Sequence, residues 1–349
     1  MPATTLVPAS AESLPQVAAF LSSGFHAGPD DHFATEKYLR WQYLDWPSGP
    51  GERAYNCVAD ERIIAHAGIL HTKFLIPAKS ADSFPVASTL HSWLSLPKSG
   101  PAGALLLLQS FSHATIQYAF SFSPMAGSVL KSSGYALRQV LPVFRRVLNP
   151  ARWADVYRGE PRKKVLAFRI QETALALTRL IRPAPRPMEI ERVTQFDARA
   201  EAVAADASRQ AILTDRNPEF LNHLLRHPFG ETYGYYFRDN GKTVGLALLH
   251  FNRRGGLLRA KILDCLLGNA PDALSCARAL AALEKELKAR QADVVFAVAG
   301  TPWLEAGFRR AGYVRRGRNQ LMIRDPQGQL PPQVPVHMAL VDSDLAFIN

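Results

Sequence analysis

The order of hydrophobic and polar segments along the chain is the same in both halves. Residues 54–76, "AYNCVADERIIAHAGILHTKFLI", predict two strands joined by a turn at Asp60 and Glu61. Residues 233–252, "YGYYFRDNGKTVGLALLHFN", predict the same arrangement around Asn240 and Gly241, a dipeptide typical of two-residue hairpin turns. Each half therefore contains an antiparallel hairpin.

The segments after each hairpin also match. Residues 86–96 and 258–267 predict a further strand, and residues 101–115 and 272–291 predict the helix that follows it. Next come a strand, a short helix that begins at Pro124 or Pro302, a Gly-Tyr pair at Gly134 or Gly312, and a last strand. A repeat of order and spacing over about 150 residues predicts the duplication of one α/β unit.

A proline-rich segment separates the two units. "RPAPRP", at 182–187, has a composition that ends helices and favours an extended spacer. The residues before it, 163–182, have apolar positions spaced for one face of a helix. We therefore expect an N-terminal domain at 1–150, a connecting helix and linker at 151–187, and a C-terminal domain at 188–349.

Composition is that of a globular protein. The chain has 349 residues, of which 47% are hydrophobic and 20% charged, so each half can bury a core. The apolar runs are far shorter than a membrane span, and the first residues lack the pattern of a secretory signal. Cys57, Cys265 and Cys276 are odd in number and widely spaced. They favour free thiols in a cytoplasmic protein over a disulfide framework or a metal site.

The positive charge is concentrated in one region. The formal net charge is +11, and residues 131–192 hold fourteen lysines or arginines against five acidic residues. Such a band attracts phosphorylated cofactors, nucleic acid or a membrane surface, or it is a solvated basic face without a ligand. No helix-turn-helix, zinc-finger or aromatic RNA-binding motif accompanies it.

The order hairpin, strand, glycine loop, helix, strand, short helix, Gly-Tyr and strand resembles the GNAT (GCN5-related N-acetyltransferase) superfamily, once in each half. The segments that carry the resemblance are "RIIAHAGI", "KTVGLALL", "SSGYALR", "RAGYVRR" and the loop at 99–104. It implies an α/β protein with two GNAT-like domains, each a mixed, mostly antiparallel sheet flanked by helices. It also implies an acyl-CoA cofactor such as acetyl-CoA, and leaves the oligomeric state open.

The cofactor loop departs from the GNAT pattern. The superfamily's pyrophosphate signature is Arg or Gln, two residues, Gly, one residue, and Gly or Ala. In "KSGPAGA", at 98–104, Ser99 and Ala102 do not fit the first two positions, whereas Ala104 fits the last. The loop can still offer backbone N–H groups and a helix N-terminus to a phosphate. The resemblance thus implies a cofactor site formed by Lys98, Ser99, Gly100, Ala102, Gly103 and Ala104. The second half, "LLGNAPDALSCARAL", lacks the signature, so we expect it to be structural or to complete the acceptor pocket.

His91 is the candidate catalytic base. The two-residue period of "STLHSW" predicts Thr89, His91 and Trp93 on one face of a strand, where a histidine of near-neutral pKa suits proton abstraction. The alternative is a structural histidine with satisfied hydrogen bonds. GNAT enzymes often use a tyrosine four residues before the Gly-Tyr glycine as the acid. That position is Leu130 in the first half and Phe308 in the second, so the usual acid is missing.

Other polar and aromatic residues are candidates for the acceptor cleft. His66 and His71 lie on the predicted hairpin, and Trp41 and Tyr43 resemble the early aromatic segment that covers the GNAT acceptor site. The alternative for Trp41 and Tyr43 is packing in the core or in a loop, which is the commoner role of such aromatics. Asp264, in the apolar strand "KILDCLL", requires a cationic partner, which a lysine or an arginine can supply.

Three functions are compatible with these features. The first is an acyl-CoA-dependent acyltransferase, an N-acetyltransferase in its simplest form, that acylates an amine or hydroxyl of a small molecule or sugar. The second is a non-catalytic GNAT-like protein that binds a ligand or a partner, which the altered loop and the missing tyrosine favour. The third is a binder of nucleic acid or lipid surfaces driven by positive charge, which predicts a steep loss of binding with salt.

Overall fold

The computed structural model describes residues 4–46, 52–79, 83–154, 185–269, 271–343 and 346–347, and residues 166, 170 and 174. The first unit consists of β1 (Thr5–Pro8), α1 (Leu14–Gly24), η1 (His32–Ala34), α2 (Glu36–Tyr43), β2 (Ala54–Ala59), β3 (Arg62–Leu75), β4 (Val86–Ser95), α3 (Ala102–Phe111), β5 (Ile116–Phe120), α4 (Pro124–Ser132) and β6 (Ala136–Val147).

The second unit follows α5 (Pro150–Ala154) and repeats this order with insertions. It consists of β7 (Glu189–Val193), α7 (Ala198–Ala207), β8 (Ile212–Thr214), α8 (Pro218–Leu225), β9 (Glu231–Asp239), β10 (Lys242–Arg254), β11 (Leu257–Leu267), α9 (Ala273–Ala289), β12 (Val294–Val298), α10 (Pro302–Arg310), β13 (Val314–Arg324), β14 (Val336–His337) and η4 (Leu340–Asp342). Most of the predicted connecting helix, residues 182–184 of the proline-rich linker and much of the basic band lie outside the described residues.

The strands of both units form one continuous sheet. Their order is β1-β2-β3-β4-β5-β13-β6-β12-β11-β10-β9-β7, and β8 links β3 to β14 beside it. The neighbours β4–β5 and β11–β12 are parallel, whereas the other pairs along this path are antiparallel. The mixed, mostly antiparallel sheet expected from the sequence is confirmed.

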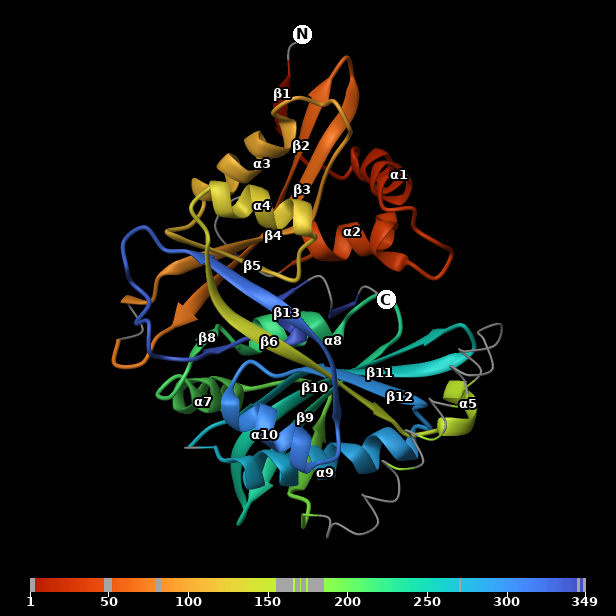
Figure 1. The fold of residues 1–349 in the computed structure, drawn as a ribbon, viewed down its shortest axis with the longest axis vertical. Helices are drawn as coiled ribbons and strands as arrows, with labels where there is room; N and C mark the ends of the chain where they lie inside the picture. The colour runs from red at the N-terminus through yellow and green to blue at the C-terminus, as the bar shows by residue number, and fades with distance from the viewer. Residues whose placement is uncertain are drawn as a thin grey trace.

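The strand that follows the last α-helix of each unit is exchanged with the other unit. β13 of the second unit lies between β5 and β6, and β6 of the first unit lies between β13 and β12. Figure 1 shows the two strands crossing the middle of the molecule, between the first unit at the top and the second below. The local pattern of the sequence does not predict this exchange, which makes the two units parts of one sheet.

The hairpin turns and the proline-started helix predicted from the sequence are present. Asp60 and Glu61 have φ values of 48° and 61°, and Asn240 and Gly241 have φ values of 50° and 77°, as a two-residue turn with left-handed residues requires. Ser123 accepts a hydrogen bond from the backbone N–H of Ala126 and so caps α4, which begins with proline.

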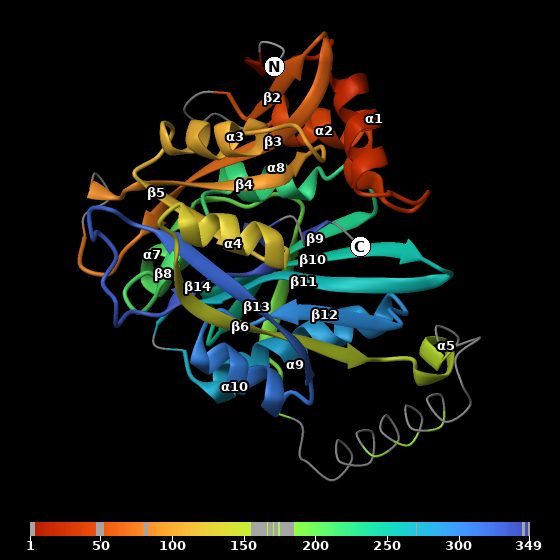
Figure 2. The same ribbon diagram turned by 45° about the horizontal axis from the view of Figure 1, so that its top comes forward.

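Helices cover opposite faces of the first unit's strands. Ala67 and Ile69 of β3 pack in one apolar cluster with Leu106 of α3. Gly68, between them, faces the other way, and a Cβ there would come within 2.6 Å of the Tyr43 ring at the end of α2. Figure 2 shows α3 on one side of β2 and β3 and α1 on the other.

The largest apolar cluster spans both units. It joins residues of α1, α2 and β3, such as Leu39 and Phe74, to residues of the second unit such as Leu213, Leu248 and Val336. All five are fully buried. The space between the units is therefore partly core, and the cavities described next lie at its edge.

Candidate functional site

A crevice opens where β4 and β5 separate. The two strands pair only over Ala87–Thr89 and Ile116–Tyr118, although β4 continues to Ser95 and β5 to Phe120. The gap holds a cavity of about 190 Å³, whose lining includes both strand ends, the start of α4 and Ser343 of the C-terminal segment. The crevice therefore reaches through the sheet from the side of α4 to the side of the C-terminal segment.

A bulge in β4 changes which way its side chains point. Gly68 of β3 pairs with His91 and His66 pairs with Leu94, so Ser92 and Trp93 together face a single residue of β3. Ser92 has a φ of +50°, the left-handed conformation that a bulge residue can adopt. The expectation that His91 and Trp93 share a face is therefore wrong. The bulge turns the Trp93 ring to α3, whereas His91 lies beside α2.

The predicted cofactor loop lies at the end of β4, beside this crevice. Lys98 and Gly100 have φ values of 65° and 62°, and Pro101 is the N-cap of α3. The carbonyl oxygen of Gly103 accepts a hydrogen bond of 3.1 Å from Nε1 of Trp93. A Cβ at Gly103 would lie 3.1 Å from Oγ of Ser95, so α3 starts in close contact with the strand end. Ala102 and Ala104 belong to the same first turn, and Ser99 precedes it; the cofactor-binding role of these residues stays a prediction.

A second cavity, of about 270 Å³, lies on the other side of the sheet, between the units. Its lining combines residues of β3 and β4 with Trp46 and Arg53 from the first unit, and residues of the segment around α8 from the second. Because the second unit supplies one wall, this pocket is complete only in the two-unit chain.

His91 and Tyr118 line both cavities. His91 stands on β4 just beyond the last paired residue, and Tyr118 is the last paired residue of β5. Both side chains are buried. Burial raises the pKa of Tyr118 well above its ordinary value, so its hydroxyl stays protonated and can donate a hydrogen bond. Sequence reasoning missed Tyr118; its place at the end of the strand parallel to that of His91 is the signal that could have found it.

Gln42 of α2 orients the candidate base. Its amide nitrogen lies 3.3 Å from Nδ1 of His91, and both residues are buried. A carboxamide can present either its oxygen or its nitrogen to a ring nitrogen. With the oxygen turned to Nδ1, that nitrogen carries the proton and Nε2 keeps a lone pair. Only this arrangement leaves Nε2 able to take a proton.

Of the residues predicted for the acceptor cleft, His71 lines the 270 Å³ cavity. Burial and the charge of Arg53 lower the pKa of His71 to about 4, so it is neutral at pH 7. Trp41, Tyr43 and His66 do not line this cavity. Trp41 stacks on His223 of α8 and joins the two units. The role of His71, Trp41, Tyr43 and His66 at an acceptor site stays a prediction.

His66 is held by two hydrogen bonds inside the first unit. Its Nδ1 donates to Oδ1 of Asn56 over 2.8 Å, and the Tyr43 hydroxyl donates to its Nε2 over 3.2 Å. Complete burial lowers the pKa of His66 to about 3. A neutral ring with both nitrogens engaged is suited to a structural role.

The corresponding crevice of the second unit is filled. β11 and β12 pair only over Arg259–Lys261 and Val294–Phe296, and the gap beyond leaves a cavity of about 10 Å³. His337, from the C-terminal segment, lines this space and lies 3.0 Å from Oδ1 of Asp264. At Gly300, after β12, a Cβ would come within 2.2 Å of the backbone nitrogen of Met338. The C-terminal segment thus occupies the place that a ligand could take in the first unit.

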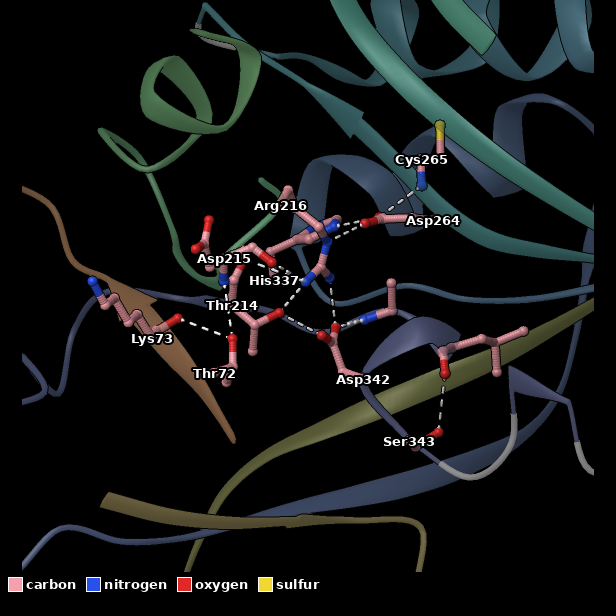
Figure 3. A network of polar contacts seen from close by, with 12 residues as sticks. Thr72, Lys73, Thr214, Asp215, Arg216, Asp264, Cys265, His337, Asp342 and Ser343 are labelled. Carbon is pink, nitrogen blue, oxygen red and sulfur yellow. Dashed lines mark hydrogen bonds and ion pairs between the residues drawn. The ribbon is translucent and has the colours of Figure 1, made fainter. Parts of the chain in front are cut away.

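A buried ionic network fixes this arrangement (Figure 3). Arg216 donates to Asp264 over 2.5 Å and to Asp342 over 2.8 Å, and Thr214 also bonds Asp342. Burial opposes ionisation of Asp264, but the charge of Arg216 and the hydrogen bond from His337 outweigh it and hold the pKa below its usual value. Thr214 and Asp342 also line the 270 Å³ cavity, so the network supports the wall of that cavity. The predicted cation beside Asp264 is an arginine.

Other site classes find no support among the residues that the structure describes. No group of three or more His, Cys, Asp or Glu side chains is placed to hold a metal ion there. The helices in this part of the chain are all too short or too polar to cross a membrane.

Searches against known proteins give matches to solved structures. No protein-family model matches the chain, and no curated protein matches it. A GCN5-related N-acetyltransferase from Anabaena variabilis is similar over 92% of this chain and 72% of its own, with a TM-score of 0.60 and 15% identity. One from Kribbella flavida is similar over 92% and 71%, with a TM-score of 0.56 and 15% identity.

The N-myristoyltransferase of Saccharomyces cerevisiae, solved with bound myristoyl-CoA, is similar over 100% of this chain and 86% of its own, with a TM-score of 0.60 and 11% identity. At these identities, the likeness shows the fold. The chain has the tandem GNAT fold, and the resemblance drawn from the sequence is confirmed at that level.

Proposed function

We propose that this protein is an acyl-CoA-dependent acyltransferase that moves an acyl group, acetyl in the simplest case, to an amine or hydroxyl of a small acceptor. The observation that carries the proposal is that a crevice through the sheet, open on the side of α4, and a pocket between the units share His91 and Tyr118. A thioester and a nucleophile entering from the two sides would meet at these residues. The buried free thiols of the three cysteines are compatible with a cytoplasmic setting.

The donor would occupy the crevice between β4 and β5. Its pantetheine arm would run between the strand ends, and its pyrophosphate would lie at the loop from Lys98 to Ala104. Without the usual arginine, the phosphates would rely on the N–H groups of the first turn of α3 and on the Lys98 charge. The yeast N-myristoyltransferase binds myristoyl-CoA, which supports an acyl-CoA donor in this fold.

The chemistry would be direct transfer. The nitrogen or oxygen of the acceptor forms a bond to the thioester carbon, and Nε2 of His91 accepts the proton that the acceptor loses. The C–S bond then breaks, and the proton passes to the sulfur as CoA leaves. Because its pKa is raised, Tyr118 stays protonated and donates a hydrogen bond to the developing negative charge. Gln42 acts as a positioning residue through Nδ1 of His91.

A non-catalytic, ligand-binding protein is the second candidate. Leu130 and Phe308 stand where GNAT enzymes often have their acidic tyrosine, and both are buried apolar side chains. On this alternative the crevice binds an acyl-CoA or a related ligand without turnover.

The experiment that tests the proposal follows the release of CoA thiol from acetyl-CoA with a panel of small amines and hydroxyl compounds. We expect turnover that falls about 10²- to 10⁴-fold in His91→Gln, with unchanged affinity for CoA. His250→Gln is the matched control, because His250 is also buried and lies outside the lining of both cavities. Binding of CoA without turnover of any acceptor would favour the non-catalytic alternative.

A further inference from the structure

The wall of the 270 Å³ cavity carries charges of both signs. Arg53 and Lys73 come from the first unit, and Asp215 and Glu219 come from the second. Lys73 and Glu219 are exposed, so solvent screens their charges. Arg53 is buried and Asp215 is half-buried, so solvent screens the charges of these two side chains less.

Arg53 is built into the wall. Its side chain is 7% exposed, and its guanidinium carbon lies 5.2 Å from the centre of the Trp46 ring. Burial lowers its pKa to about 10, so it is still charged at neutral pH. Its backbone carbonyl accepts a hydrogen bond of 2.6 Å from Ile69, which ties it to β3. A guanidinium fixed on an aromatic ring presents a planar set of donors that matches a carboxylate.

Asp215 is also held in place, by other contacts. Its backbone N–H donates to the carbonyl oxygen of Lys73 over 2.9 Å, and Nδ2 of Asn217 donates to its Oδ2 over 2.8 Å. Asn217 in turn caps α8. Figure 3 shows the Asp215 carboxylate turned away from the guanidinium of Arg216. Asp342, the other carboxylate nearby, is bound by Arg216 and Thr214, so Asp215 is the one oriented for a ligand.

An acceptor with one kind of charge would be repelled by one of these two groups. A molecule that carries an anionic and a cationic group would pair with both Arg53 and Asp215. Replacing either of its charges with a neutral group would weaken its binding. A third group, the nucleophile, has to reach His91 on the same lining. At about 270 Å³, the cavity suits a small molecule.

From this arrangement we infer that the acceptor is a small, amino-acid-like zwitterion. Arg53 binds its carboxylate, Asp215 binds its ammonium group, and a separate amine or hydroxyl is acylated beside His91. The inference rests on the proposed acyltransferase function and names the acceptor class for the same site.

Three probes that carry the same distal amine test it with acetyl-CoA as donor. L-lysine has both head-group charges and a distal amine, cadaverine lacks the carboxylate, and 6-aminohexanoate lacks the second amine. We expect kcat/KM for lysine to exceed that for either of the others about tenfold or more. Ornithine, putrescine and 5-aminopentanoate repeat the comparison with a chain shorter by one carbon.

Variants assign each charge to its residue. Arg53→Gln should abolish the preference for lysine over cadaverine and keep the preference over 6-aminohexanoate. Asp215→Asn should do the reverse, and both should raise KM far more than they lower kcat, with unchanged affinity for CoA. Asp239→Asn, a change in a partly exposed ion pair outside this cavity, is the control.

Equal use of the three probes, or a preference for cadaverine or for an uncharged amine or sugar, overturns the inference and leaves the acyltransferase proposal standing. So does a preference for lysine that neither variant alters. If no acceptor in any panel supports thioester cleavage and CoA does not bind, the proposed function itself is contradicted.

Discussion

Nε1 of Trp93 donates a hydrogen bond to the carbonyl oxygen of Gly103 over 3.1 Å, and this bond ties the first turn of α3 to the bulge in β4. The bulge puts Trp93 on the side of α3 and His91 on the side of α2. One local irregularity thus places the predicted donor loop and the predicted base on opposite sides of the same strand.

The hydrogen bond between Trp93 and Gly103 can be removed by one substitution. Trp93→Phe keeps an aromatic ring but removes the N–H donor, so the start of α3 loses its link to the strand. A partly buried hydrogen bond of this kind contributes about 1 kcal/mol, and we expect the Kd for CoA to rise about fivefold. Calorimetric titration measures it. An unchanged Kd would show that this hydrogen bond does not position the cofactor loop.

Tyr118→Phe tests the hydrogen-bond donor at the junction of the cavities. The change keeps the buried ring and removes the hydroxyl, so stability should change little. Loss of a donor to developing charge lowers kcat about 10²-fold in other enzymes, and we expect a similar loss here. Steady-state kinetics with saturating acceptor measure it. A full kcat in this variant would remove Tyr118 from the mechanism.

The buried histidine His66 makes stability depend on pH. Its pKa is about 3 in the folded chain, below that of an exposed histidine. Between pH 6.5 and 3 the unfolded chain binds a proton there that the folded chain does not, so stability falls as the pH is lowered. The slope is about 1.4 kcal/mol per pH unit for one such group. Urea unfolding at pH 7 and pH 5 should show a smaller loss in His66→Gln than in the wild type. The same loss in both would contradict the assignment.

The network around Arg216 should be essential for stability. Asp264→Ala removes one of two carboxylates from a fully buried guanidinium, which costs about 3–5 kcal/mol in comparable pairs. Asp239→Ala breaks the partly exposed pair with Arg278 and should cost about 1 kcal/mol or less. Urea unfolding compares the two. Equal losses would mean that the network adds no special stability.

Local patterns predicted most of the elements and their order. The hairpin turns at Asp60–Glu61 and Asn240–Gly241 and the proline-started helices α4 and α10 follow from residues close together in the chain. The exchange of β6 and β13 does not, because a strand's own residues do not specify which distant strand pairs with it. The formation of one shared sheet therefore depends on pairing between strands that are far apart in the chain.

The candidate site was predicted in part for the same reason. His91 could be selected as a polar residue on an apolar strand, and the structure places it at both cavities. The bulge at Ser92 could not be foreseen, because no glycine marks the left-handed residue. Tyr118 was missed because an acid was sought at the position of Leu130, where the helix buries an apolar side chain. Arg53 and Asp215 meet in one cavity only through the packing of the two units.

The central claim is that the chain binds a thioester donor in the first unit's crevice. Calorimetric titration of acetyl-CoA and CoA into the wild type, Gly103→Glu and Leu274→Glu tests it most directly. Both changes put a carboxylate in the first turn of a helix, α3 in one unit and α9 in the other. We predict binding of about one cofactor per chain, lost in Gly103→Glu and kept in Leu274→Glu. No binding at millimolar cofactor, or equal binding in Gly103→Glu, would contradict the claim.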